Sequence, residues 1–276
     1  MTKDEIVLRG EELKVLLKAI DNKYGYDFSQ YSQVFLQRRF VNFMIARKLR
    51  TTEELSDRLL RDEQLFEDLI PHISITVTEM FRDPFFYRGV REKIVPRLAT
   101  YPFIKVWIAG CATGEEAYSI AILLKEHNLL GRSVIYATDI NQRALQAARE
   151  GMYQVRNMKQ YTENYIRSGG TNSFSEYYTA RYDFALFDRT LANKIVFAPH
   201  NLVTDNAFNE FQLIVCRNVL IYFNEDLQNR VTSLFYDSLC NFGFLALGNK
   251  ESLLFMDKKD RFQEVDRKEK IFIKKG

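Results

Sequence analysis

The sequence has few of the residues that mark specialised classes of protein. Among its 276 residues are 12 Gly and 5 Pro, too few for a collagen-like or low-complexity disordered chain. Its cysteines, Cys111, Cys216 and Cys240, lie too far apart in the sequence for a zinc knuckle or a redox pair, and their odd number suits a reducing compartment. We therefore expect no metal site and no disulfide bond.

Long apolar runs and a strong excess of one charge are also missing. No segment approaches the roughly 18 apolar residues that span a bilayer. The charged start MTKDEIVLRGEELK lacks the apolar core of a signal peptide. The net charge of +3 is too small to indicate general binding to nucleic acid. We expect a cytoplasmic protein that neither enters a membrane nor binds nucleic acid.

The rest of the composition is that of a globular protein. Hydrophobic residues make up 46% of the chain and charged residues 27%, so it can bury a sizeable core. Its length is near twice the roughly 150 residues of a common domain, which predicts one large or two modest domains.

The first eighty residues show helical periodicity. A first helix is indicated by Leu13, Leu16, Leu17, Ile20 and Tyr24, with Gly25 as a stop. A second helix is indicated by Leu36, Phe40, Phe43 and Met44. Thr51 and Glu54 form a capping-box pattern that opens a third helix, expected to continue through LSDRLLRDEQLFEDLI to Pro71.

From Lys105 the pattern alternates between short apolar runs and helical stretches. A strand, a helix, a second strand and a second helix are indicated in turn by KVWIAG, EEAYSIAILLKEH, SVIYATD and NQRALQAARE. This alternation predicts a parallel sheet. KIVFAPHN, FQLIVCRN, GFLALG and KEKIFIKK are further strands, and NEDLQNRVTSLFYDSL is a helix. Asn141 and Asn224 are expected N-caps. The polar, tyrosine-rich segment of about 152–193 reads as an inserted hairpin. We therefore expect a helical domain over 1–80, a linker over 81–104 and an α/β domain over 105–276.

The loop between the first strand and its helix is a candidate ligand site. Gly110 and Gly114 would let the backbone approach a ligand and leave the helix N-terminus free to face it, although tight packing of strand against helix would also require them. Asp139 ends the next strand, where a carboxylate can accept both hydroxyls of a ribose, or can cap the following helix. Glu115 and Glu116 compensate the helix dipole in one interpretation. In the other they repel a pyrophosphate and suit a ligand with an ammonium and a sulfonium, which favours S-adenosylmethionine over NAD.

The sequence lacks the characteristic residues of two other enzyme classes, the hydride-transferring oxidoreductases and the amino-methylating DNA enzymes. The pair Tyr101 and Lys105 leads into the first strand, away from the strand ends where a hydride site would lie. The Asn-Pro-Pro-Tyr loop of amino-methylating DNA enzymes is replaced by Arg217, Asn218 and Val219.

Five stretches of the sequence stand out together: TVTEMFRDPFFY, AGCATGEEAYS, YATDIN, CRNVLIYF and LGNKESL. Through these stretches the sequence resembles the chemoreceptor glutamate methyltransferases, called CheR, over nearly its whole length. The resemblance implies an all-α N-terminal domain followed by a Rossmann-like class I methyltransferase domain with a doubly wound sheet. It also implies a small antiparallel β-subdomain at the inserted segment.

The resemblance also implies roles for individual residues. Thr78 and Arg82 would reach S-adenosylmethionine from the linker. Glu116 would hold the amino acid end of the cofactor and Asp139 its ribose. The adenine and methionine sides would be lined by Asn201, Leu202, Asn218 and Val219. Gly110 belongs to the same cofactor loop, and Tyr222 would face the transferring methyl group. Thr76 stands where family members commonly have Asn; its hydroxyl can replace one amide hydrogen bond but not two.

Methyl transfer to a glutamate needs no general base, because a model Glu with a pKa of about 4.3 is already an anion at neutral pH. His72, His127 and His200 are accordingly expected to be structural or surface residues. We expect Arg82 and Tyr222 to hold the acceptor carboxylate in line with the methyl group. The alternatives are an ion pair of Arg82 with Asp83 or Glu79, and an interface aromatic role for Tyr222.

The run SQVFLQRRFVNFMIARKLR has five basic and no acidic residues. On a helix, Arg39, Phe43, Arg47 and Arg50 would share one stripe, either as a solvated face or as a surface for an acidic receptor helix. The tyrosine-rich insert could dock a receptor tail by strand addition, which only some members of the family use.

The sequence thus predicts a monomeric protein-glutamate O-methyltransferase that acts on the cytoplasmic domain of chemoreceptors and releases S-adenosylhomocysteine. The alternatives are a methyltransferase of the same fold acting on another protein or a small carboxylate, a non-catalytic module that binds S-adenosylmethionine, and, more remotely, an NAD oxidoreductase.

Overall fold

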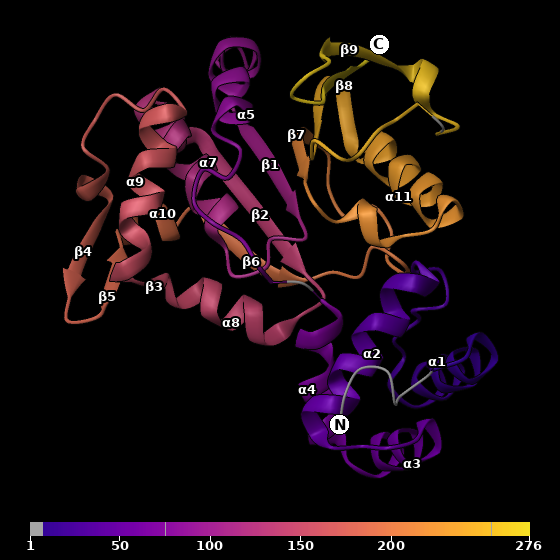
Figure 1. Cartoon of the computed structure of the whole chain (residues 1–276). Helices are drawn as coiled ribbons and strands as arrows, with labels where there is room; N and C mark the ends of the chain where they lie inside the picture. Colours follow the sequence, from indigo (N-terminus) through magenta and orange to yellow (C-terminus); the bar gives the residue numbers. More distant parts are fainter. Residues whose placement is uncertain (1–7, 75, 255) are drawn as a thin grey trace.

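The structure is a computed structural model that describes residues 8–74, 76–254 and 256–276 (Figure 1). The N-terminal part is helical, with α1 (Gly10–Tyr24), α2 (Gln33–Arg47), α3 (Thr52–Arg61) and α4 (Glu63–Ile73) around a core of their own. Gly25 ends α1 in the left-handed region at φ 71°, as predicted. The helical pattern of the sequence is therefore confirmed here.

The single third helix expected from the sequence is wrong, because the chain forms two helices there. Asp62 leaves the helical region at φ −122°, and its side chain accepts a hydrogen bond from Leu65 N at 3.1 Å, so it caps a new helix. Pro71 does not end α4, which continues to Ile73. It lies in the last turn, where the missing N–H removes one backbone hydrogen bond.

Residues 84–98, which the sequence analysis treated as linker, are helical. The segment comprises α5 (Pro84–Gly89), a π-helical turn (Val90–Ile94) and α6 (Val95–Leu98). Apolar residues of all three pieces lie in the core beneath the sheet, and Phe86, Tyr87 and Leu98 are fully buried. The chain that reaches the cavity described below is thus anchored on a packed helix.

A seven-stranded sheet follows, in the order β6-β2-β1-β7-β8-β10-β9. Its parallel strands are β1 (Ile104–Ala109), β2 (Ser133–Asp139), β6 (Ile195–Pro199), β7 (Phe211–Cys216) and β8 (Leu239–Leu247). The antiparallel edge is formed by β10 (Ile271–Lys274) and by β9 (Phe262–Asp266), a strand that sequence analysis missed. Helices α7 (Glu115–Glu126), α8 (Gln142–Glu150) and α11 (Glu225–Ser238) connect the parallel strands.

The strand order reverses between β1 and β7. The chain runs from β1 outward to β2 and β6, then returns to the other side of β1 as β7. In open parallel sheets, ligands bind at such a reversal, outside the carboxyl ends of the strands. The predicted fold class, an all-α domain followed by a Rossmann-like doubly wound domain, is confirmed, as are the N-caps Asn141 and Asn224.

The inserted segment forms a second, antiparallel sheet in the order β3-β5-β4. Its strands are β3 (Met152–Gln154), β4 (Tyr178–Arg181) and β5 (Phe184–Phe187), with the short helix α10 (Arg189–Ala192) behind them. The helix α9 (Met158–Arg167) lies between β3 and β4, where the sequence predicted only a hairpin. Tyr165 and Tyr177 donate to the Glu126 carboxylate of α7, which also pairs with Arg91. The insert is thereby held against the main domain.

Two sets of contacts join the helical part to the α/β part. On one side Ser32 N donates to Tyr222 O at 2.8 Å, and Asn224 N donates to Gln30 O at 2.9 Å. On the other side Asp68 of α4 accepts from Arg143 of α8 at 2.7 Å. No helix within the described part of the chain has both the length and the apolar content that crossing a bilayer requires.

Candidate functional site

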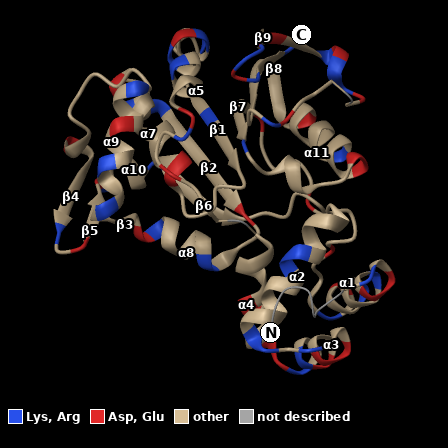
Figure 2. Ribbon diagram, in the orientation of Figure 1, with Lys and Arg blue, Asp and Glu red and all other residues tan. Residues whose placement is uncertain are grey.

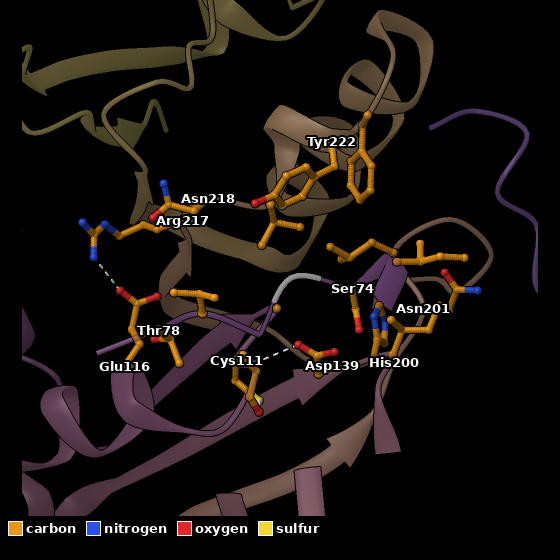
Figure 3. Close-up of a pocket in the computed structure, with 18 of the residues that line it drawn as sticks. Ser74, Thr78, Cys111, Glu116, Asp139, His200, Asn201, Arg217, Asn218 and Tyr222 are labelled. Atoms are coloured by element: carbon orange, nitrogen blue, oxygen red, sulfur yellow. Dashed lines mark hydrogen bonds and ion pairs between the residues drawn. The ribbon is translucent and has the colours of Figure 1, made fainter. Parts of the chain in front are cut away.

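A cavity opens at the carboxyl ends of β1, β2 and β7, between the sheet and the helical part (Figure 3). The residues predicted from the sequence that border it are Thr78, Arg82, Gly110, Glu116, Asp139, Asn201, Leu202, Asn218, Val219 and Tyr222. They come from the segment after α4, from the first turn of α7, from the ends of the four parallel strands β1, β2, β6 and β7, and from the loop before α11. Segments far apart in the sequence therefore meet at the reversal of strand order.

The two glycines of the first loop have different surroundings. Gly110 has φ 77°, and a Cβ there would collide with the Val219 side chain across the cavity wall. Gly114 has φ 94°, and a Cβ there would meet Ala148 and Tyr153 instead. Gly114 is thus explained by tight packing, whereas Gly110 allows two parts of the cavity wall to approach each other.

Asp139 joins the two loops at the cavity floor. Its Oδ2 accepts from Ala112 N at 2.8 Å and its Oδ1 accepts from Asn141 N at 2.9 Å. Burial raises the pKa of Asp139, and these backbone hydrogen bonds oppose that rise. Asn141 rather than Asp139 caps α8, since its side chain accepts from Ala144 N at 3.1 Å. Each Asp139 oxygen keeps a further lone pair for a ligand hydroxyl.

Glu116 is held by a buried arginine that sequence analysis did not assign to the site. Arg217 donates to Glu116 Oε1 at 2.8 Å and to Asp83 Oδ2 at 2.6 Å, and its guanidinium lies 4.2 Å from the centre of the Phe86 ring. Although burial opposes the charge, the neighbouring Glu116 raises the pKa of Arg217 above its usual value. Its position directly after a buried strand, in CRN, indicates the edge of the sheet on which Arg217 lies, but no local pattern indicates that it is buried and paired.

Glu115 does not border the cavity, whereas Glu116 does. The Glu115 side chain is only 5% exposed, turned away from the cavity lining, and it accepts from Thr113 Oγ1 at 2.6 Å. Burial raises its pKa to about 7. The expectation that both acids face the cofactor is therefore wrong for Glu115, because a helix turns adjacent residues about 100° apart.

Glu251, in the LGNKESL stretch, shapes the opposite wall. It is 4% exposed, and its Oε1 accepts from Val219 N and Leu220 N, both at 2.8 Å. Its Oε2 accepts from Gly248 N at 2.5 Å and Asn218 N at 3.1 Å. This carboxylate fixes the backbone that carries Asn218, a non-glycine residue at φ 61°.

Tyr222 and Arg82 stand at the side of the cavity nearest the helical part. The Tyr222 ring packs on Phe35 of α2 at 4.6 Å between ring centres. Burial raises the pKa of Tyr222, while the positive charges of Arg39, Arg82 and Arg38 oppose that rise. Arg82 donates to Val77 O at 3.3 Å.

The alternative ion pair of Arg82 with Asp83 or Glu79 is wrong. Within residues 8–74, 76–254 and 256–276 no ion pair involves Arg82, and Asp83 is bound by Arg217 instead. The Arg82 charge is therefore not neutralised by either neighbour.

Thr76 and the histidines differ in their relation to the cavity. Thr76 is not among the residues that border it, whereas His200, expected to be structural or a surface residue, does border it. The His200 ring stands edge-on to Trp107 at 5.2 Å. His72 bonds to Asp68 O at 3.0 Å and His127 lies 3.4 Å from Arg91, both away from the cavity lining.

The predicted basic stripe is wrong as a single surface. Helix α2 ends at Arg47, because Lys48 adopts φ 57° and Leu49 N bonds back to Met44 O at 2.9 Å, so Arg50 lies beyond the helix. Phe43 is fully buried, and Arg47 pairs with Asp68 at 2.5 Å.

Arg39 is the member of the stripe that lies near Tyr222, although it is not among the residues that border the cavity. Its guanidinium lies 5.4 Å from the Phe35 ring centre, and Tyr222 packs on the same ring. Burial and the adjacent Arg38 lower the pKa of Arg39. Arg38, which sequence analysis did not single out, also acts on Tyr222.

The cavity thus has two chemically different ends (Figure 3). Asp139 and Glu116 present carboxylate oxygens at the strand ends, which suits ribose hydroxyls and an ammonium group. The Tyr222 end lies within the field of arginines. These residues fit S-adenosylmethionine. Within the described ranges no group of three or more His, Cys, Asp and Glu is placed to hold a metal ion.

Comparison with known proteins gives matches along the whole chain. A family model described as CheR methyltransferase, all-alpha domain, matches residues 11–74, and one described as CheR methyltransferase, SAM binding domain, matches residues 76–271. A Pseudomonas putida protein named "Putative methyltransferase Cher3" is 49% identical over 263 residues, covering 95% of this chain and 96% of that protein. A Listeria innocua chemotaxis protein methyltransferase is 31% identical over 239 residues, covering 86% of this chain and 88% of its own.

Proposed function

The chain belongs to the CheR methyltransferase family and uses S-adenosylmethionine, and we propose that it methylates glutamate side chains in the cytoplasmic domain of chemoreceptors. The cofactor supplies a methyl group carried on a sulfonium, and its loss leaves S-adenosylhomocysteine. The relatives named chemotaxis protein methyltransferases support the receptor as substrate.

The carboxylate end of the cavity would hold the cofactor. Asp139 would accept from the ribose hydroxyls, and the Glu116 oxygen that Arg217 leaves free would accept from the ammonium. Gly110, Asn201 and Leu202 would border the adenosine, with Thr78, Asn218 and Val219 along the methionine. Arg217 and Glu251 do not need to touch the cofactor, since they hold the residues that do.

One observation supports an acidic acceptor above all: Arg82 and Tyr222 both border the cavity, and the Arg39 guanidinium lies over the Phe35 ring on which Tyr222 packs. Removing water from a carboxylate costs several kcal/mol unless other donors replace it. Arg82 and Tyr222 would donate to the glutamate carboxylate and leave one oxygen aligned with the methyl group. Such alignment can contribute on the order of 7 to 11 kcal/mol.

The chemistry requires no proton transfer to the enzyme. A glutamate with a pKa of about 4.3 arrives as an anion at neutral pH. Tyr222 stays protonated there because burial raises its pKa, so its hydroxyl can donate to that anion. His200 borders the cavity but packs against Trp107 rather than Tyr222.

The partner is expected to be the receptor alone, bound by a monomer in the cytoplasm. The insert would offer a further contact in those receptors that carry a docking tail. Strand β4 lies at the edge of the small sheet, so a peptide could add to it by backbone hydrogen bonds.

The proposal is tested by incubating the protein with tritiated S-adenosylmethionine and purified cytoplasmic fragments of chemoreceptors from the same genome. We expect base-labile label on the fragment and a mass increase of one methyl group at glutamates. Label on another protein in a matched lysate, with none on the fragments, would favour a different acceptor. Binding of S-adenosylhomocysteine without any transfer would favour a non-catalytic module, and binding of NADH instead would favour an oxidoreductase.

A further inference from the structure

An exposed phenylalanine surrounded by three cations lies outside the cavity. Phe85, at the start of α5, is 45% exposed. The guanidinium carbons of Arg88 and Arg167 lie 5.5 Å and 5.7 Å from its ring centre, and Lys268 Nζ lies 5.1 Å from it. We call these four residues the Phe85 cluster. Figure 1 shows α5 between α9, which ends at Arg167, and the strand β9 that precedes Lys268.

Within the described residues the three charges of the cluster form no ion pair, although Lys268 acts electrostatically on the adjacent Glu269 carboxylate. No ion pair in the described part of the chain involves Arg88, Arg167 or Lys268. Asp266, the last residue of β9, is bound by Lys93 at 2.5 Å and by two backbone N–H groups. Glu269 is 7% exposed. Three like charges around one ring repel each other, so an anionic partner would bind there favourably.

The cluster does not border the cavity, but Phe85 and Arg88 belong to the chain segment that follows the cavity residue Arg82. Arg82 borders the cavity, Asp83 binds Arg217, and Phe86 stacks on the same guanidinium. Phe85 is exposed beside the buried Phe86, so a protein that extends from the cavity along α5 would meet the cluster. Figure 2 shows that Lys and Arg are spread over many elements of the chain, on both the helical and the α/β part.

We propose that the Phe85 cluster binds an acidic segment of the protein substrate that flanks the methylated glutamate. The proposal rests on the proposed function for the identity of the substrate. Three cations surround the partly exposed Phe85 ring, and their combined charge favours an acidic protein segment as the partner. An acidic helix satisfies all three cations and packs its aliphatic stems on Phe85 and on the neighbouring Ile166, which is 61% exposed.

The test is a binding measurement that does not depend on methyl transfer. The probe is a fluorescein-labelled 20-residue peptide of a chemoreceptor methylation region rich in glutamate, titrated by anisotropy with protein saturated with S-adenosylhomocysteine. The variants are Lys268→Glu, whose side chain makes no hydrogen bond within the described residues, and Arg88→Glu with Lys268→Glu. Lys18→Glu, an exposed cation on α1, is the matched control.

We expect the double variant to raise the peptide Kd roughly tenfold at low salt, with the difference shrinking at high salt and the affinity for S-adenosylhomocysteine unchanged. A Kd equal to that of the Lys18→Glu control would overturn the proposal, as would loss of binding to phosphatidylglycerol vesicles without loss of binding to the peptide. If wild-type protein transfers no methyl group but the variants still bind the peptide less tightly, the proposed function fails and the cluster stands. If transfer occurs and the variants bind normally, only the cluster fails.

Discussion

Arg217 bonds to Glu116 at 2.8 Å while its other nitrogen bonds to Asp83 at 2.6 Å. One buried guanidinium therefore links the helix that follows the first strand to the segment that carries Arg82. The Arg217 side chain is 2% exposed and that of Glu116 is 13% exposed, so little water could replace Arg217 beside the Glu116 carboxylate.

Replacing Arg217 by Ala should reduce both stability and cofactor affinity. Removing one partner of a buried pair leaves the other charge unpaired and costs roughly 3 to 5 kcal/mol. Chemical denaturation should show this loss, and calorimetry should show weaker binding of S-adenosylhomocysteine. Arg217→Lys should recover part of the stability, since it keeps the charge but loses the two-pronged geometry. The control Arg61→Ala, which removes an exposed pair with Asp57, should change stability little. Equal effects of the two alanine variants would contradict the role of Arg217.

Glu251→Gln should weaken the wall that carries Asn218 and Val219. An amide cannot accept four backbone hydrogen bonds, because its NH₂ group points at N–H donors. We expect a loss of about 1 to 3 kcal/mol in the free energy of unfolding and a lower affinity for S-adenosylhomocysteine. Glu264→Gln on the exposed edge strand β9 is the control. Unchanged cofactor affinity in a folded Glu251→Gln protein would show that the loop does not need this carboxylate.

Glu115 should make the stability depend on pH in a defined range. Its pKa is raised from 4.5 to about 7 in the folded protein by burial. The folded state therefore holds a proton that the unfolded state has released, so stability falls as the pH rises through this range. At about 1.36 kcal/mol per pH unit, the loss is of order 3 kcal/mol above pH 7. In Glu115→Gln the free energy of unfolding should fall less between pH 4.5 and pH 8. Parallel profiles for the two proteins would refute the assignment.

Arg39 and Arg47 should behave differently although they lie on the same helix. Arg39→Glu should slow association with an acidic receptor fragment on the order of tenfold and make the association rate less dependent on salt. The reason is that the positive charge of Arg39 acts on the Tyr222 side of the cavity, where the acidic acceptor would bind. Arg47→Glu should instead lower stability slightly, since Arg47 pairs with Asp68. Stopped-flow association and thermal unfolding measure the two effects. Similar association rates for both variants would mean that Arg39 does not guide the substrate.

Tyr222→Phe and Arg82→Ala should lower kcat with little change in the affinity for S-adenosylhomocysteine. Both groups would contact the acceptor carboxylate, and each lost charge-assisted hydrogen bond costs about 1.5 to 3 kcal/mol, or roughly 10- to 100-fold in rate. The wild-type rate should rise through the pKa of the acceptor and stay level from pH 6 to pH 9. A rate that follows a group titrating near pH 6.5 would point to a histidine base and against this chemistry.

The positions at strand ends were predictable from the sequence. Gly110, Asp139 and Asn218 each follow an apolar strand, and parallel strands bring their carboxyl ends to one edge. The period-2 and period-3.6 patterns are local, so they identified the sheet and the helices. Several boundaries were wrong. Asp62 could equally well lie inside a helix or cap one, and Lys48 adopts a left-handed conformation that the sequence does not require.

The buried charges became recognisable only in the structure. Arg217 and Glu251 look like surface residues in the sequence, because charged side chains are usually solvated. Their partners lie 101 and 33 residues away, so no local pattern could pair them. No local pattern could have placed Arg39 near Tyr222 either, or gathered the three cations around Phe85, because these residues also come from distant parts of the chain.

By itself, then, the sequence determined the type of fold, the edge of the sheet that bears the site and the residue types that suit the cofactor. Local periodicity and strand polarity are properties of the chain, which is why they can be read without coordinates. The tertiary structure decided which charges are buried and paired and which remain free to meet a substrate. Those outcomes depend on distances between segments that only folding brings together.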